Sequence, residues 1–158
     1  MKRYTTTRCA TLFAGSALAG LAIISPATGA IQGRTAARQE RLTESGTLRI
    51  TRAAGFVVEA SGQVTGTLHG VLSLRLTLVS TSRLTATFTG HPRNGTLSGQ
   101  GAGSYHLVGA VARFGGVATI TGGSGAYARA SGGGIQVNGT MNRQKKIVTL
   151  QVAGNFRP

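Results

Sequence analysis

The chain has 158 residues, of which 17 are Lys or Arg and only 3 are Asp or Glu, so its formal net charge is +14 at pH 7. This length is enough for one domain with its own hydrophobic core. With so few carboxylates, hydrolysis by a pair of them is disfavoured. The charge favours anionic partners, and it is equally consistent with scattered arginines that only keep a protein dispersed.

Residues 1–30 are typical of a secretory signal peptide. The segment starts with basic residues, is apolar over residues 10–24 and ends in small residues, so cleavage is expected after Ala27 or Ala30. A membrane anchor is the alternative, but the apolar run is shorter than the roughly 20 residues that a span needs. We therefore expect a secreted, periplasmic or cell-envelope protein with no membrane span once the signal is removed. The single cysteine, Cys9, leaves with the signal.

Residues 31–45 are predicted to be a polar leader that precedes the folded domain, which then spans residues 46–158. The leader is rich in Gln, Arg and Glu and contains Glu40 and Glu44. Terminal segments of this kind commonly lie outside the core. This assignment leaves Glu59 as the only carboxylate of the predicted domain.

From Gly46 onward, apolar and polar residues alternate with the period of two that is typical of a half-buried strand. The clearest example is residues 71–80, where leucines alternate with Ser73, Arg75 and Thr77. Asn94-Gly95 marks a hairpin turn, because both residue types tolerate positive φ. The predicted strands lie within residues 46–51, 56–69, 71–80, 84–88, 97–108, 110–120, 134–141 and 147–156.

No apolar stripe of helical period follows residue 45. Many short strands separated by turns predict an all-β fold, which is a closed antiparallel barrel of eight strands or a β-sandwich. A short parallel β-helix is a further alternative, favoured by the bias toward Gly, Thr and Ser.

One glycine-rich segment, T-I-T-G-G-S-G-A-Y-A-R-A-S-G at residues 119–132, resembles the Gly-Gly-Thr-Gly-x-aromatic-x-x-Ala-x-Gly signature of the allene oxide cyclase and dirigent proteins. In this sequence Ser124 replaces the usual threonine, and Ser131 stands where plant members carry arginine. The resemblance implies an eight-stranded antiparallel barrel, often trimeric, whose lumen can hold a small apolar ligand. The segment is predicted to form a structural turn from Gly122, Gly123, Ser124, Gly125, Tyr127 and Gly132.

Two charged residues within otherwise apolar predicted strands are candidates for ligand binding. Glu59 follows an apolar run, and Arg75 interrupts the leucine-rich strand. If both side chains face the interior of a barrel, they can pair and orient a polar group of a ligand, because an unpaired buried charge is expensive. If both face solvent, they are ordinary surface residues. Tyr105 and Arg113 complete the candidate ligand-binding set.

Other chemistry is not indicated. His69, His91 and His106 are isolated from cysteines and carboxylates, so neither a metal site nor a catalytic triad is predicted, and no cofactor is expected. The glycine-rich segment leads into a strand and contains no lysine, which argues against phosphate binding. The few aromatic residues occupy core-like positions, so nucleic-acid binding is not expected.

These observations favour an exported, non-catalytic barrel that binds a small apolar ligand or an anionic cell-envelope polymer, and a homodimer or homotrimer is compatible with them. One alternative is a cyclase or isomerase that acts by confining its substrate. Enzymatic members of the resembled family rely on acidic groups inside the barrel, and the predicted domain contains only Glu59. The other alternative is a structural or adhesive surface protein.

Overall fold

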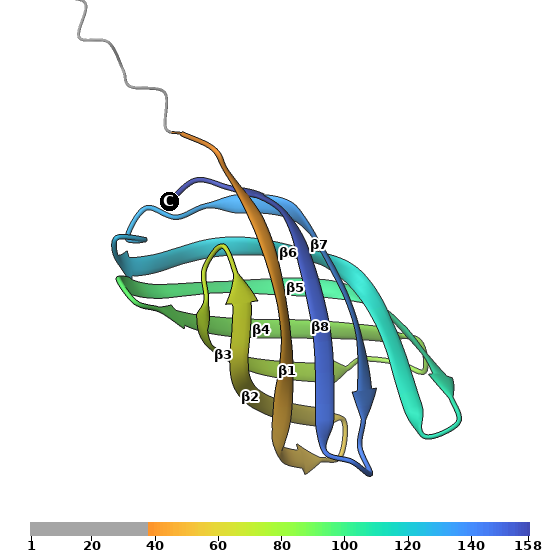
Figure 1. Cartoon of the computed structure of the whole chain (residues 1–158). Coiled ribbons are helices and arrows are strands. Elements are labelled where there is room, and N and C mark those ends of the chain that lie inside the picture. The colour runs from red at the N-terminus through yellow and green to blue at the C-terminus, as the bar shows by residue number, and fades with distance from the viewer. Residues whose placement is uncertain (1–37) are drawn as a thin grey trace, which may run out of the picture. The chain divides into compact units, whose positions relative to one another are not determined.

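The computed structural model describes residues 38–158. Within this range the fold is all-β, and eight antiparallel strands close into a barrel, as predicted (Figure 1). The predicted signal peptide and residues 31–37 of the predicted leader lie outside the described residues. The strands are β1 (Glu40–Ala54), β2 (Val57–Gly66), β3 (Gly70–Leu78), β4 (Arg83–Pro92), β5 (Gly95–Val108), β6 (Val111–Gly125), β7 (Gly132–Asn142) and β8 (Ile147–Phe156).

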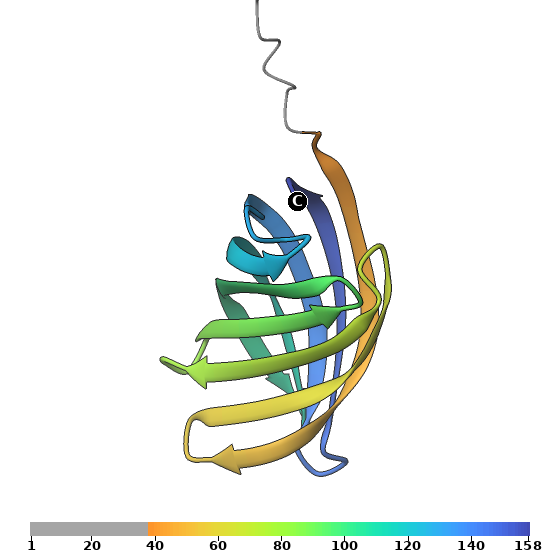
Figure 2. The ribbon, with the colours of Figure 1, turned by 90° about the vertical axis from the view of Figure 1, so that its left-hand side faces the viewer.

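Each strand of the barrel pairs with the next strand in the sequence, so the chain runs up and down around the barrel (Figures 1 and 2). Strands β1 and β8 close the barrel by an antiparallel pairing that runs from Glu40 opposite Phe156 to Arg49 opposite Ile147. This pairing gives every strand two neighbours, and closure removes the free sheet edges that would otherwise invite aggregation. In the described part of the chain, no helix is long and apolar enough to cross a membrane.

Strand β1 begins at Glu40, so residues 40–45 belong to the barrel and the prediction of a polar leader is wrong for them. Leu42 and Glu44 are buried, whereas Arg41 before them and Thr43 between them are exposed. The segment therefore alternates between the inner and outer face like the rest of the strand. Its polar composition reflects an outer face of polar residues and one inward carboxylate.

The meander places four hairpin turns at one end of the barrel and three at the other (Figure 1). We call the first the four-hairpin end; its turns are residues 55–56, 79–82, 109–110 and 143–146. The three-hairpin end has turns at residues 67–69, 93–94 and 126–131. Gly55 and Gly109 in the tight turns of the four-hairpin end have φ values of 55° and 61°, a conformation that glycine adopts without steric cost.

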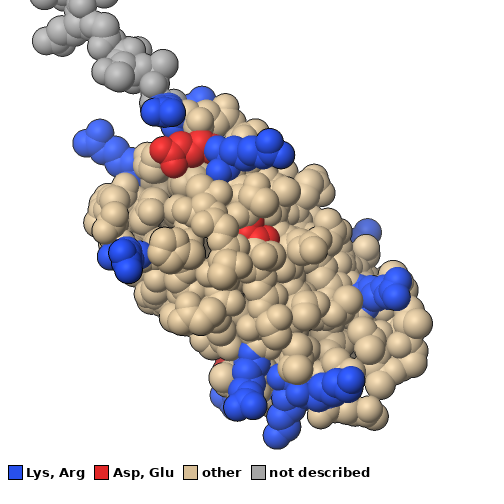
Figure 3. All heavy atoms as spheres, viewed as in Figure 1, with Lys and Arg blue, Asp and Glu red and all other residues tan. Residues whose placement is uncertain are grey.

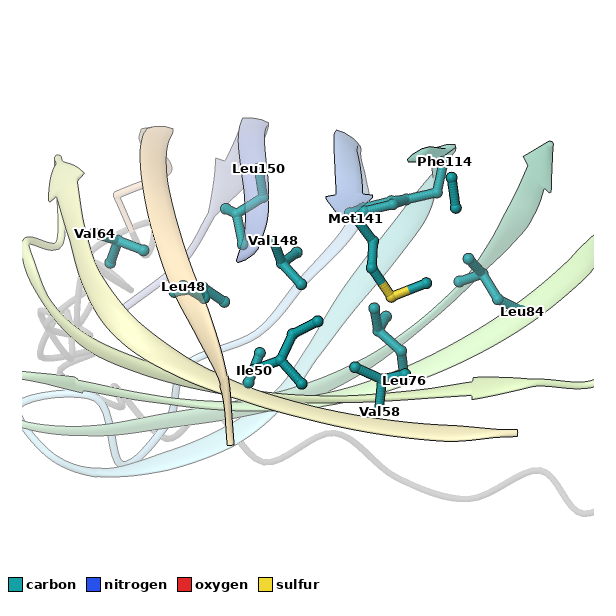
Figure 4. Packing of buried hydrophobic residues seen from close by; sticks show 12 residues of the cluster. Leu48, Ile50, Val58, Val64, Leu76, Leu84, Phe114, Met141, Val148 and Leu150 are labelled. Carbon is teal, nitrogen blue, oxygen red and sulfur yellow. The ribbon is translucent and has the colours of Figure 1, made fainter. Parts of the chain in front are cut away.

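Two clusters of buried hydrophobic residues occupy the interior. One fills the barrel toward the four-hairpin end, and Figure 4 shows its side chains converging from strands that are distant in the sequence. Its main members are Leu48, Ile50, Val58, Leu76, Leu84, Phe114, Met141, Val148 and Leu150. The other lies toward the three-hairpin end and consists of Leu42, Leu97, Ala118, Ile120, Ala130, Ile135 and Phe156.

The glycine-rich segment has a structural role, but its first part is strand rather than turn. Residues 122–125 form the end of β6 and pair with β5, and the turn follows at residues 126–131. Gly123 lies so close to β5 that an added Cβ would be 2.3 Å from the Thr96 carbonyl oxygen. Tyr127 packs against the buried cluster of the three-hairpin end. Gly132 opens β7 against the side chain of Phe156.

Candidate functional site

The lumen contains a cavity of about 140 Å³ between the two buried clusters. Residues from both clusters line it, and they come from all eight strands. Apart from one carboxylate, the lining side chains are apolar or absent. The lining includes Leu42, Val64, Leu68, Leu72, Leu74, Leu76, Leu84, Phe88, Leu97, Phe114, Ile120, Ile135, Val137, Leu150 and Val152.

Several of the residues that line the cavity carry no side chain. Gly101 and Gly103 of β5 and Gly116 of β6 line one side of it. Leu72 and Leu74 of β3 also face the lumen but are only half-buried. A leucine that points into a fully packed interior would be buried. The accessible surface that these two side chains keep therefore faces the cavity.

Glu44 is the one charged residue among those that line the cavity in the described chain. Its residue surface is only 8% exposed. The Oε1 atom accepts a hydrogen bond from the backbone N–H of Leu68. The Oε2 atom is buried and has no hydrogen-bond partner among the described residues. An unpartnered buried carboxylate oxygen costs folding free energy, so this atom is the feature of the cavity that most needs a partner.

The turn between β2 and β3 is fixed to β1 by hydrogen bonds. It thereby positions the Leu68 N–H group, which donates a hydrogen bond to Glu44. The backbone N–H of Thr67 donates to the Thr43 carbonyl oxygen over 3.1 Å. The Thr67 Oγ1 atom accepts from the Thr43 N–H at 3.1 Å and donates to the Arg41 carbonyl oxygen at 3.2 Å. Gly66 precedes this turn with φ of 146°, and an added Cβ there would lie 2.9 Å from Glu44 Oε2.

Burial raises the pKa of Glu44 above its ordinary value, because the cavity solvates the ionised form poorly. The N–H of Leu68, the positive charge of His69 and the N–H of Thr67 act in the opposite direction but do not cancel the effect of burial. When ionised, the carboxylate can only accept hydrogen bonds, and when protonated it can also donate one. The site can therefore bind a donor group or take part in proton transfer.

The predicted ligand-binding residues do not line this cavity. Glu59 and Arg75 stand opposite each other on β2 and β3, and Arg75 Nη1 lies 3.6 Å from Glu59 Oε1. Their side chains are 34% and 59% exposed, respectively, so the pair forms on the outer face of the barrel. Arg113 is also exposed. Tyr105 is half-buried against the cluster of the four-hairpin end, and its hydroxyl donates to the Ser80 carbonyl oxygen at 2.9 Å.

Sequence reasoning missed Glu44 because it placed this residue in the leader. Leu42 was the one apolar signal before Leu48, because the inward positions of β1 between these two residues are Glu44 and Gly46. Among residues 38–158, no three His, Cys, Asp or Glu side chains are grouped so that they could hold a metal ion. Comparisons with protein-family models, with curated proteins and with solved structures found no match to the chain.

Proposed function

We propose that the barrel is an exported binding protein whose lumen holds a small apolar ligand. The cavity beside Glu44 is the observation that carries this proposal. An engineered protein cavity of about 150 Å³ lined by Leu, Ile and Phe stays free of water and binds benzene. The present cavity has a similar volume, about 140 Å³, and a similar lining. A ligand of about the size of one aromatic ring therefore fits it.

Glu44 adds a chemical preference to this ligand class. Glu44 lines the cavity and its Oε2 atom has no hydrogen-bond partner among the described residues, so a ligand that brings one hydrogen-bond donor to this carboxyl would satisfy it. An ammonium group gives the stronger bond because both partners are charged, and a hydroxyl gives a weaker one. A carboxylate ligand meets a like charge and no basic side chain among the lining residues. The ligand expected here has an apolar body and one amine or hydroxyl group.

The test uses ethylbenzene, benzyl alcohol and benzylamine, which have the same number of non-hydrogen atoms, and benzoate as the anionic probe. Affinities are measured by calorimetry for the wild type and for Glu44→Gln. A charge-assisted hydrogen bond contributes about 1.5–3 kcal/mol, so benzylamine should bind the wild type about tenfold or more tightly than ethylbenzene. In Glu44→Gln this preference should disappear while ethylbenzene still binds.

Two failures of this test are distinguishable. If none of the four probes binds the wild type, the lumen is not a site for small apolar ligands. If ethylbenzene binds as tightly as benzylamine, the cavity binds ligands but Glu44 does not select them. Gly90→Val gives an independent check, because Gly90 lines the cavity. The control is Gly122→Val, since Gly122 is also a strand glycine but does not line the cavity. Only the first substitution should weaken ethylbenzene binding.

A second candidate function is a cyclase or isomerase that uses Glu44 as its proton-transfer group. The place of this carboxyl in the cavity lining favours it, and so does the upward direction of its pKa shift, because a carboxyl that keeps its proton more readily can serve as a general acid. The resemblance to the allene oxide cyclase and dirigent proteins stays a prediction, and a barrel fold alone does not specify an activity. Native mass spectrometry of protein from its host separates the two functions. A stoichiometric bound molecule that the protein leaves unchanged supports binding, and its conversion into a product supports catalysis.

A further inference from the structure

The four-hairpin end of the barrel carries most of the large hydrophobic side chains that are exposed in the described residues. Five of the seven such residues lie there, namely Phe56, Val79, Leu107, Val108 and Ile147. Phe56 and Leu107 are the most exposed, at 73% and 70%. Every hairpin of this end contributes at least one within two residues of its turn, whereas the three-hairpin end contributes only Val71 by the same criterion. Single exposed apolar residues are ordinary, but this concentration at one end marks an interaction surface.

Hydrogen bonds fix three of these four hairpin tips. They connect the tips at residues 55–56, 79–82 and 143–146 to a different strand or turn, so the apolar side chains of these tips are presented on a preorganised rim rather than on independent loops. The bonds run from Leu78 N–H to Phe56 O (2.8 Å), from Tyr105 Oη to Ser80 O (2.9 Å), from Arg143 Nη2 to Gly55 O (3.0 Å) and from Ile50 N–H to Lys146 O (2.9 Å).

The same end is strongly basic. Figure 3 shows Lys and Arg side chains gathered around the turns that join β1 to β2 and β7 to β8. Glu59 is the one acidic residue near this end within residues 38–158, and Arg75 already pairs with it at 3.6 Å. The basic residues of this end are all exposed and comprise Arg49, Arg52, Arg83, Arg113, Arg143, Lys145 and Lys146.

We infer that the four-hairpin end docks on the surface of a lipid bilayer that contains anionic phospholipid. Aromatic and aliphatic side chains at hairpin tips can enter the headgroup region, and the surrounding cations bind the anionic surface. A second copy of the chain fits less well, because a symmetric contact would bring the cations of two copies together. A soluble polyanion would use the cations but not the exposed apolar tips. This inference is independent of the proposed ligand.

Flotation of the full chain with vesicles tests the inference, using phosphatidylcholine alone and phosphatidylcholine mixed with phosphatidylglycerol. We expect binding to the mixed vesicles and more than about 30-fold weaker binding to the neutral ones, because neutral lipid removes the contribution of every cation. Each cation near an anionic surface changes the affinity by about fivefold, so Arg49→Gln combined with Lys145→Gln should weaken binding by roughly 30-fold. The control, Arg93→Gln combined with Arg129→Gln, alters two exposed arginines in the turns of the three-hairpin end and should have a much smaller effect.

The apolar contribution is tested with Phe56→Ser combined with Leu107→Ser. The control pair is Val71→Ser and Val117→Ser, which changes the two exposed hydrophobic residues outside the four-hairpin end. We expect the first pair to weaken vesicle binding at least tenfold and to abolish the vesicle binding that persists in high salt. The control pair should leave the affinity and the salt-resistant binding nearly unchanged. All variants contain residues 1–37, so any effect of that segment on vesicle binding is common to them. Urea unfolding midpoints verify that each variant is folded.

Several results would overturn the inference. Absence of binding to the mixed vesicles does so directly. If vesicle binding is insensitive to Phe56→Ser and Leu107→Ser, and if the protein binds dextran sulfate with equal affinity, the site binds an anionic polymer instead. Self-association in sedimentation velocity that Phe56→Ser abolishes, without vesicle binding, identifies a contact between copies of the chain.

Discussion

Replacing Gly90 by valine tests whether the lumen is hollow where the structure places its cavity. Gly90 lies in β4, with Leu72 and Leu97 opposite it on the neighbouring strands. An added Cβ would have as its nearest atoms the Leu97 carbonyl oxygen at 3.9 Å and Leu72 Cδ1 at 4.0 Å, which are ordinary van der Waals distances. The first atom of the new side chain therefore meets no obstacle. The variant should be more stable than the wild type.

The size of this effect follows from two contributions. A glycine in a strand interior is less favourable than alanine by about 0.5–1 kcal/mol, because it loses more conformational entropy on folding. Two additional methyl groups in the cavity contribute up to about 0.8 kcal/mol each. The control Gly122→Val receives only the first contribution, because no atom lies within 4 Å of its added Cβ. Gly90→Val should therefore exceed its control by about 1 kcal/mol or slightly more.

Urea denaturation followed by circular dichroism measures both variants against the wild type. The urea concentration at the midpoint of unfolding should rise for Gly90→Val. The slope of the free energy with denaturant should stay the same, because an unchanged slope indicates an unaltered folded state. A Gly90→Val protein that is about 1 kcal/mol less stable than the wild type, beside a Gly122→Val protein that is not, would refute the reasoning. It would mean that side chains already fill this part of the lumen, because overpacking destabilises a core.

Two further predictions concern the charged residues. Because the pKa of Glu44 is raised in the folded protein, ionisation of this carboxyl opposes folding, and its contribution to stability is lost as the pH rises from the ordinary value of 4.5 through the raised one. The free energy of unfolding of Glu44→Gln, measured by urea titration, should therefore increase relative to that of the wild type as the pH rises across this range. A difference that does not change with pH would contradict the raised pKa of Glu44. Arg75→Gln should change the free energy of unfolding by less than about 1 kcal/mol, because its ion pair with Glu59 lies on the outer face. A loss of several kcal/mol would show that the pair is buried.

The sequence predicted most of the barrel because its strands depend on local patterns. Alternation between inner and outer faces identifies β3, β4 and β6, and the Asn94-Gly95 pair places its hairpin to within one residue of the observed turn at residues 93–94. The start of β1 could not be predicted in the same way. Its inward positions at residues 42–46 are a leucine, a glutamate and a glycine, so a test for apolar alternation fails there.

The resemblance implied a lumen that can hold a ligand, but the residues that line the cavity were not predicted, because the lining depends on which side chains share the interior of the closed barrel. Gly101 and Gly103 appear in the sequence as weak points of a strand, and only the closed barrel shows that they line the same cavity as the leucines of β3. Glu59 and Arg75 illustrate the same dependence. Their direct opposition on β2 and β3 follows from the strand register, and their outward direction follows from burial of the adjacent Val58 and Leu76.

The position of Glu44 is the reason that we propose a ligand with a hydrogen-bond donor. The chain has three acidic residues, and one of them is buried in an apolar lumen with an oxygen that has no partner among the described residues. A protein that needed only solubility or stability would gain more from this carboxylate on its surface, where water solvates it. A ligand with a donor group supplies the missing partner and lowers the cost of the buried charge. Such a ligand should therefore stabilise the fold by more than its apolar contact area alone accounts for, whereas a hydrocarbon of equal size should not.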